Sequence, residues 1–122
     1  MAANLVNTPA NELKAVISGA LSGTPQVIGQ LPCVALEDAD ANNQLAVKLD
    51  GVFTLSVKGI DGGGNVAVTN GDILYFVSGD TPKLSKKTSG VRFGYAWSPT
   101  AAAGATLVAS GATTTIQVKL GY

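Results

Sequence analysis

Residues 44–58 read QLAVKLDGVFTLSVK, and apolar side chains recur at every second position on both sides of a central Asp50-Gly51 pair. A β-strand sends successive side chains to opposite faces, so this alternation predicts a strand with one buried face and one solvated face. The residues predicted to point inward are Leu45, Val47, Leu49, Phe53, Leu55 and Val57.

The Asp50-Gly51 pair is also typical of a two-residue hairpin turn. Such a turn would pair Leu49 with Val52 and would place the last three inward residues on the opposite face from the first three. A continuous strand that bends at Gly51 keeps all six on one face, so we predict a single bent strand. At about 3.3 Å per residue it would span roughly 50 Å, which is too long to stay straight in a small domain. It must therefore wrap a core.

Shorter strand patterns, separated by glycine and proline, occupy much of the remaining chain. We expect strands in residues 12–17, 27–28, 31–36, 83–85, 92–97 and 114–120. Asn70-Gly71 is typical of a type I′ hairpin turn ahead of the apolar segment 73–77. The fold class predicted is all-β, a small β-barrel or rolled antiparallel sheet. Residues 1–11, which are short, polar and interrupted by Pro9, are predicted to form an extended N-terminal arm before a single β domain at 12–122.

Charge is sparse and balanced, with eight Lys and Arg residues against eight Asp and Glu residues, and charged residues make up 13% of the chain. Binding to nucleic acid through phosphate contacts needs a basic surface, so no nucleic-acid partner is expected. No apolar run approaches the roughly 20 residues of a membrane-spanning helix, so no membrane partner is expected. A surface with so little charge suits a protein that is packed against neighbours.

The chain contains no histidine, which excludes Ser-His-Asp and Cys-His catalysis and most zinc sites. Cys33 is the only cysteine and follows Pro32 in an apolar segment, so we interpret it as a buried structural thiol. A lone cysteine cannot form an internal disulfide, which fits synthesis in a reducing cytosol.

Asp38, Asp40 and Asn42 have the spacing that opens a calcium-binding loop. Asn43 stands where such a loop needs glycine, and Leu49 stands where it needs a bidentate glutamate. The preferred interpretation is therefore a solvated connection, and a weak ion site is the alternative.

Other polar features predict little chemistry. The glycines at 62–64 lack the rest of a phosphate-binding loop and are interpreted as a surface loop. Nothing in the sequence places two carboxylates across a cleft, so the acids of this region are interpreted as surface groups: Glu37, Asp38, Asp40, Asp50 and Asp61. Trp97 is interpreted as a core or interface residue, with a sugar-stacking platform as the alternative. No catalytic residue, metal ligand or cofactor is predicted.

Five segments, taken in order, resemble the capsid cement (decoration) proteins of tailed bacteriophages. They are LAVKLDGVFTL (45–55), GDILYF (71–76), VRFGYAW (91–97), AAAGAT (101–106) and TTIQVKL (114–120). The chain departs from the family pattern at Cys33, where glycine is usual, and in the longer stretch 105–113. Members of the family are sometimes labelled as recombinases. This chain lacks the nucleotide-binding loop, the basic groove and the α/β alternation that such an enzyme would need.

The resemblance implies a non-enzymatic structural protein that assembles as a homotrimer and caps three-fold or quasi-three-fold positions on the outside of a phage head. Its partners would be the major capsid protein and further copies of itself. It would be made in the host cytoplasm and located in the virion. In the family an N-terminal arm can extend onto the shell and add to its sheets. The residues expected to bind the capsid in this way are Ala2, Ala3, Asn4, Leu5, Val6, Asn7 and Thr8.

Segments 73–77 and 92–97 offer more apolar surface than one core face needs. We expect them to form the trimer interface through Ile73, Tyr75, Val77, Phe93, Tyr95 and Trp97. The alternative hypothesis is a non-catalytic carbohydrate-binding β module of a virion that uses Trp97. A third hypothesis, an enzyme that uses the acids of 37–40, is placed below both.

Overall fold

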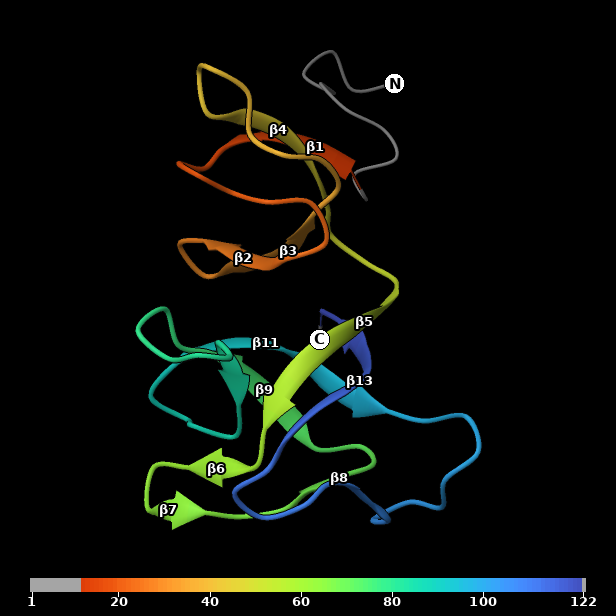
Figure 1. The fold of residues 1–122 in the computed structure, drawn as a ribbon. Coiled ribbons are helices and arrows are strands. Elements are labelled where there is room, and N and C mark those ends of the chain that lie inside the picture. Colours follow the sequence, from red (N-terminus) through yellow and green to blue (C-terminus); the bar gives the residue numbers. More distant parts are fainter. Residues whose placement is uncertain (1–11, 122) are drawn as a thin grey trace.

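The computed structural model describes residues 12–121, which form strands and turns without a helix (Figure 1). This confirms the all-β class, while the predicted arm at 1–11 lies outside the described residues. A four-stranded N-terminal sheet and a closed five-stranded barrel make up most of the fold, with two small two-stranded sheets attached. The strands are β1 (Glu12–Val16), β2 (Pro25–Ile28), β3 (Leu31–Ala35), β4 (Gln44–Lys48), β5 (Val52–Lys58), β6 (Ile60–Asp61), β7 (Gly64–Asn65), β8 (Val68–Thr69), β9 (Ile73–Phe76), β10 (Leu84–Ser85), β11 (Val91–Trp97), β12 (Thr106–Val108) and β13 (Thr113–Leu120).

The N-terminal sheet has the strand order β1-β4-β3-β2 and is antiparallel throughout. Gly29, with a φ of 63°, forms the turn of the β2–β3 hairpin, a conformation that glycine adopts at little cost. The sheet encloses a small core of Ala15, Ala20, Cys33, Ala35, Leu45 and Val47. Cys33 is fully buried, as predicted, and its burial raises the pKa of the thiol to about 11. The thiol is therefore protonated and inert at neutral pH.

The predicted continuous strand over residues 44–58 is wrong, because the structure divides it into β4 and β5, which belong to different sheets. β4 pairs with β1 and β3, whereas β5 pairs with β13 and β10, so the two halves do not form a hairpin either. Gly51, with a φ of 108°, lies where the chain leaves one sheet for the other (Figure 1). The alternation holds within each half, and it buries Leu45, Val47, Leu55 and Val57.

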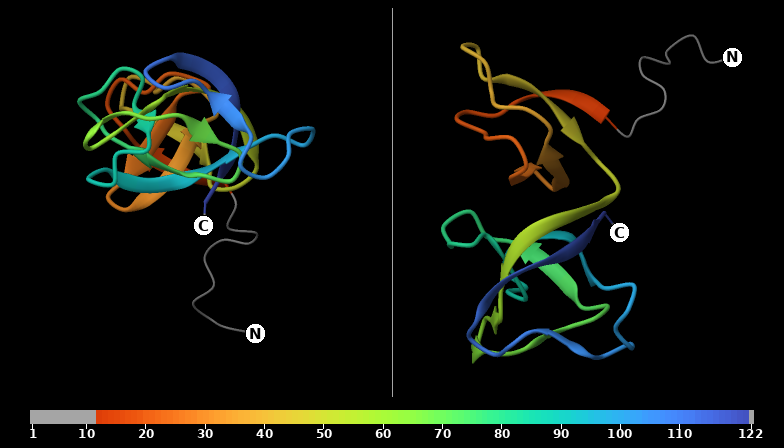
Figure 2. Two further views of the ribbon diagram at one scale, coloured as in Figure 1. Left: turned by 90° about the horizontal axis from the view of Figure 1, so that it is seen from below. Right: turned by 45° about the vertical axis from the view of Figure 1, so that its right-hand side comes forward.

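The barrel closes in the order β10-β5-β13-β11-β9, with β10 parallel to β5 and the other neighbours antiparallel. β10 meets β5 at a single register pair, Leu84 with Val57, so residues 52–56 of β5 are paired with β13 alone. β13 is paired with both β5 and β11 over residues 117–119, where it offers no free edge for another strand to join. Val34 of β3 belongs to the barrel's own core, so the N-terminal sheet packs on one end of the barrel (Figure 2). The remaining core residues are Leu55, Val57, Val68, Leu74, Phe76, Leu84, Phe93, Ala96, Val108, Val118 and Leu120.

The hairpin predicted at Asn70-Gly71 does not form, because β8 pairs with β12 rather than with β9. The longer stretch 105–113 supplies β12, so this departure from the family pattern contributes a strand. Asn70 orders the connection through its side chain, whose Nδ2 donates hydrogen bonds to the carbonyls of Ser98 (3.2 Å) and Ala101 (3.0 Å). Local hydrogen bonds also close the turn, because the Asp72 amide donates to the Thr69 carbonyl (3.1 Å) and the Thr69 amide donates to the Asp72 carboxylate (2.7 Å). The turn therefore forms, but it does not join two paired strands.

Candidate interaction surfaces

The outward side chains of β9, β11 and β13 form a cluster that we call the aromatic patch. It consists of Ile73, Tyr75, Arg92, Tyr95 and Lys119. The registers bring them together, because Tyr95 lies opposite Ile73 on one side and opposite Lys119 on the other, and Arg92 lies opposite Tyr75. Lys119 is exposed and the other four side chains are half-buried. The patch is therefore a preformed surface on the outside of the barrel.

Two cations order the centre of the aromatic patch. The guanidinium carbon of Arg92 lies 5.4 Å from the centroid of the Tyr95 ring, and the Lys119 Nζ lies 5.9 Å from it. Arg92 also donates a hydrogen bond to the Tyr95 hydroxyl. Cations near a ring face are attracted by its quadrupole, so these contacts hold Tyr95 in place. The patch combines a fixed aromatic surface with positive charge at its border.

Five of the six residues predicted for the trimer interface are accessible, and one is not. Ile73, Tyr75 and Tyr95 belong to the aromatic patch, Val77 follows β9 and is half-buried, and Trp97 is 44% exposed. Their role in an interface stays a prediction.

Phe93 is the exception, because it is fully buried in the barrel core and stacks against Phe76 with ring centroids 6.4 Å apart. The simple alternation through 92–97 put it on the same face as Tyr95. A register shift between Arg92 and Gly94 breaks that alternation, because two steps along β11 correspond to one step along β9. The expectation that Phe93 contributes accessible surface to an interface is therefore wrong.

Trp97 borders a cleft of about 330 Å³ on the outside of the barrel, which we call the tryptophan cleft. Its walls come from β5, β11, β12 and β13 and from the residue that follows β11. The lining residues are Thr54, Trp97, Ser98, Leu107, Thr115, Ile116 and Gln117. Every one of them is uncharged at neutral pH.

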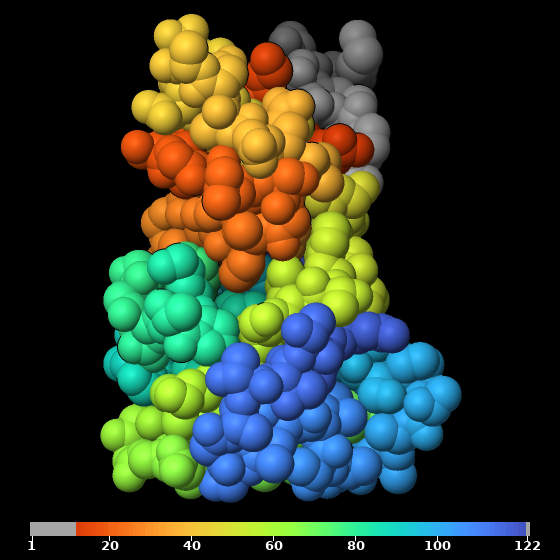
Figure 3. Space-filling model, in the orientation of Figure 1, coloured from red at the N-terminus to blue at the C-terminus, as the bar shows by residue number. Residues whose placement is uncertain are grey.

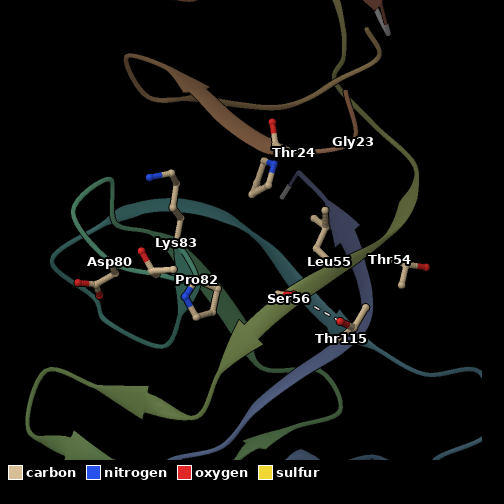
Figure 4. Close-up of a pocket in the computed structure, with 11 residues that line it drawn as sticks. Gly23, Thr24, Thr54, Leu55, Ser56, Asp80, Pro82, Lys83 and Thr115 are labelled. Carbon is tan, nitrogen blue, oxygen red and sulfur yellow. Dashed lines mark hydrogen bonds between the residues drawn. The ribbon is translucent and has the colours of Figure 1, made fainter. Parts of the chain in front are cut away.

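A second cleft, of about 390 Å³, lies where the N-terminal sheet meets the barrel, and we call it the inter-sheet cleft. It is lined by residues 23–25, 54–56, 80–83 and Thr115, and the surface is hollowed between the two sheets (Figure 3). The side chains of Leu55 and Thr54 leave β5 in opposite directions, and the Ser56 and Thr115 hydroxyls lie 3.4 Å apart (Figure 4). The Asp80 carboxylate is neutralised by Lys87 at 2.8 Å, so this cleft has no free acid to bind a cation.

Three acids that the sequence analysis considered as catalytic or ion-binding groups accept hydrogen bonds from backbone amides. They are Asp40, Asp38 and Glu37. The Asp40 Oδ1 accepts hydrogen bonds from the amides of Gln44 (2.9 Å) and Asn42 (2.8 Å), which hold the pKa of this carboxyl below its usual value. The Ser22 amide donates to Asp38, and the Ala46 amide donates to Glu37. These contacts order the turn between β3 and β4, which supports the interpretation of a solvated connection.

The described residues contain no group of three or more His, Cys, Asp or Glu side chains that could hold a metal ion. Within the same residues there is no helix long and apolar enough to cross a membrane. The predicted capsid-binding residues, Ala2 to Thr8, lie outside the part of the chain that the structure describes.

Trp97 is the one residue of the tryptophan cleft that the sequence singled out. Thr54, Thr115 and Gln117 were missed, because polar residues at alternate positions of a strand indicate only a solvated face. Their proximity to Trp97 follows from the pairing of β5, β13 and β11, which brings together residues up to 63 positions apart. The aromatic patch is assembled in the same way, by the pairing of β11 with β9 and with β13.

Comparison with known proteins gives one family. A family model described as phage cement protein matches residues 6–120, which include all thirteen strands. No curated protein and no solved structure gives a significant match. The resemblance inferred from five ordered segments is thereby confirmed.

Proposed function

Because the chain belongs to the phage cement protein family, we propose that it binds the outer surface of a phage head as a homotrimer at three-fold or quasi-three-fold positions and stabilises the shell. Membership in the family gives the chain a structural role in association with the capsid of the virion. The match over residues 6–120 is the observation that carries the proposal. The finer statements, on symmetry, orientation and stabilisation, belong to the proposal, and the aromatic patch is the surface that we assign to self-association.

We infer that the protein is not an enzyme. The acids near the β3–β4 turn bind backbone amides, and the Cys33 thiol is buried and protonated. Binding to the shell would be steric and multivalent. Three equivalent contacts in one trimer give high avidity even when each is weak, which suits a protein that ties capsomers together. Synthesis in the host cytoplasm agrees with the single, unpaired cysteine.

The trimer interface proposed here uses Ile73, Tyr75, Val77 and Tyr95, with Trp97 at its border. Half-buried apolar and aromatic side chains on a rigid sheet are typical of the centre of an interface. The Tyr95 ring is held by Arg92 and Lys119, so little side-chain entropy is lost when it becomes buried.

The copy number in purified particles tests the cement function directly. We expect roughly one chain per major capsid protein, because a closed trimer at every three-fold position supplies three chains to the three surrounding subunits. Quantitative mass spectrometry of intact heads gives this ratio. A few copies per head, or none, would contradict a shell-wide role.

Charge placed in the aromatic patch tests the interface. We expect Ile73→Asp and Tyr75→Asp to leave a folded monomer, because each removes an apolar contact and buries a carboxylate in the interface, even though Arg92 lies opposite residue 75. The desolvation of that carboxylate costs about 3 kcal/mol per chain, or roughly 100-fold in affinity. Light scattering after size-exclusion chromatography measures the mass. The matched control is Leu21→Asp, which changes an equally apolar, 59% exposed side chain in the connection between β1 and β2. Trimeric Ile73→Asp and Tyr75→Asp proteins, or a monomeric wild type, would refute this interface.

A further inference from the structure

The tryptophan cleft has the chemistry of a site for a neutral sugar. Its volume of about 330 Å³ is at the lower end of the range typical of small-molecule sites. The exposed indole of Trp97 supplies a flat apolar surface, on which the C–H face of a pyranose ring can pack. Hydroxyl groups and one amide supply hydrogen-bond donors and acceptors around it.

Strand register places the polar groups next to the indole. Gln117 lies directly opposite Trp97 on one side and directly opposite Thr54 on the other. Side chains on one face at such positions are immediate neighbours, with Cβ atoms about 5 Å apart. A ring stacked on Trp97 therefore has the Gln117 amide at its edge, and that amide both donates and accepts hydrogen bonds.

We propose that the tryptophan cleft binds a neutral oligosaccharide. An extended peptide fits less well, because β13 is paired on both sides at Gln117, with Trp97 and with Thr54, and so has no free edge there to which a peptide could add. An anionic ligand fits less well too, because no cationic residue lines the cleft, and Arg92 and Lys119 lie in the aromatic patch. A neutral, hydroxyl-rich ligand matches both the charge and the donor set.

The cleft has room for more than a terminal sugar. It shares Thr54 and Thr115 with the inter-sheet cleft, whose volume is about 390 Å³, so the two adjoin over the outer surface of β5 and β13. A chain of several sugars can start on Trp97 and continue past the Ser56 and Thr115 hydroxyls. The site can therefore bind sugar units within a polysaccharide chain as well as the unit at its end.

A sugar site in the tryptophan cleft goes beyond the cement function, and it places a separate requirement on Trp97. The indole must remain accessible in the assembled protein, so the oligomer interface is then carried by Ile73, Tyr75, Val77 and Tyr95 alone. If the protein coats the shell but binds no sugar, the sugar site fails while the cement function stands. If it binds sugar but does not coat the shell, the cement function fails while the sugar site stands. Head occupancy and sugar binding are therefore measured on the same variants.

Trp97 is the only tryptophan, so its fluorescence reports on this cleft alone. Maltohexaose, cellohexaose and chitohexaose are titrated into the full chain, and polygalacturonate serves as the charged control. We expect a saturable change in emission with at least one neutral hexasaccharide at a Kd of about 1 mM or below, and none with polygalacturonate. Absence of a saturable change with all three neutral probes up to about 10 mM would overturn the proposal, as would a preference for the acidic polymer.

Variants locate the binding by titration calorimetry. Trp97→Ala should abolish it, Trp97→Tyr should retain part of it, and Gln117→Ala should weaken it by about tenfold. The matched control is Leu21→Ala, which truncates an exposed apolar side chain in the connection between β1 and β2, outside the cleft, and should bind as wild type does. Unchanged binding by Trp97→Ala, or loss of the oligomer in both Trp97 variants, would refute the site, because in the second case the indole is part of the interface.

Discussion

Gly94→Ala is expected to lower the free energy of unfolding by about 3 kcal/mol, at the upper end of what overpacking costs. A methyl group at residue 94 would overlap the carbonyl oxygen of Lys119 and would lie 3.1 Å from its carbonyl carbon and 3.2 Å from the Leu120 Cα. These are backbone atoms of β13, to which β11 is paired at this position. Because the barrel is closed, β13 cannot move away without disturbing its pairing with β5.

Urea denaturation at a fixed protein concentration measures this loss, since the stability of an oligomer depends on concentration. The matched control is Gly79→Ala, where a methyl group would meet no atom within 4 Å and the backbone does not require glycine. That variant should stay within about 0.5 kcal/mol of wild type. Equal midpoints for the two variants would show that the barrel tolerates a wider separation of β11 and β13.

Gly94 also explains why the alternation in the sequence assigned Phe93 to the wrong face of β11. A glycine within a strand pattern often marks a bulge or a close approach of another backbone, and here it marks both. The bulge turns Phe93 into the core while Tyr95 and Trp97 remain outside. Sequence alternation alone cannot reveal such a shift, because it depends on how β9 aligns with β11 in space.

The same limit applies to the long strand pattern. Alternation over residues 44–58 correctly indicated that Asp50-Gly51 is not a hairpin turn. Of the six side chains predicted to point inward, four are buried and two, Leu49 and Phe53, are half-buried. Alternation could not show that β4 and β5 join different sheets, because that depends on their partners β1 and β13, which lie far away in the chain. At Asn70-Gly71 the predicted turn forms, but it does not create a hairpin, because β8 pairs with β12 instead of β9.

The sequence singled out the aromatic residues of the candidate surfaces but not the polar residues beside them, because strand register is again what brings these together. Large aromatic residues stand out in a sequence with few of them, so Tyr75, Tyr95 and Trp97 were found. The two threonines, the serine and the glutamine that complete the tryptophan cleft resemble the polar residues of any solvated surface. Only the register of β5, β13 and β11 distinguishes them.

Deletion of residues 2–8 is expected to weaken binding to phage heads by about 10²–10⁴-fold, which is the gain that linked contacts confer. In the proposed trimer the deletion removes three capsid contacts at once. The aromatic patch on β9, β11 and β13 is untouched, so the truncated protein should retain the oligomeric mass of the wild type. Purified protein is mixed with heads that lack it, the heads are sedimented, and the bound fraction is measured against protein concentration.

A point substitution separates strand addition by the arm from a contact made by its side chains. When a segment adds to a sheet, main-chain hydrogen bonds supply the affinity, so Val6→Pro, which removes a backbone donor, should weaken binding by about tenfold or more per contact. Val6→Thr keeps that donor and the branched side chain and should bind as wild type does. Equal binding by the two variants would mean that the arm does not add as a strand at this residue. Full binding by the deletion variant would move the capsid contact to the described surface. The exposed apolar residues of β1 and of the connections that follow β1 and β3, Val16, Leu21 and Leu36, are the next to test.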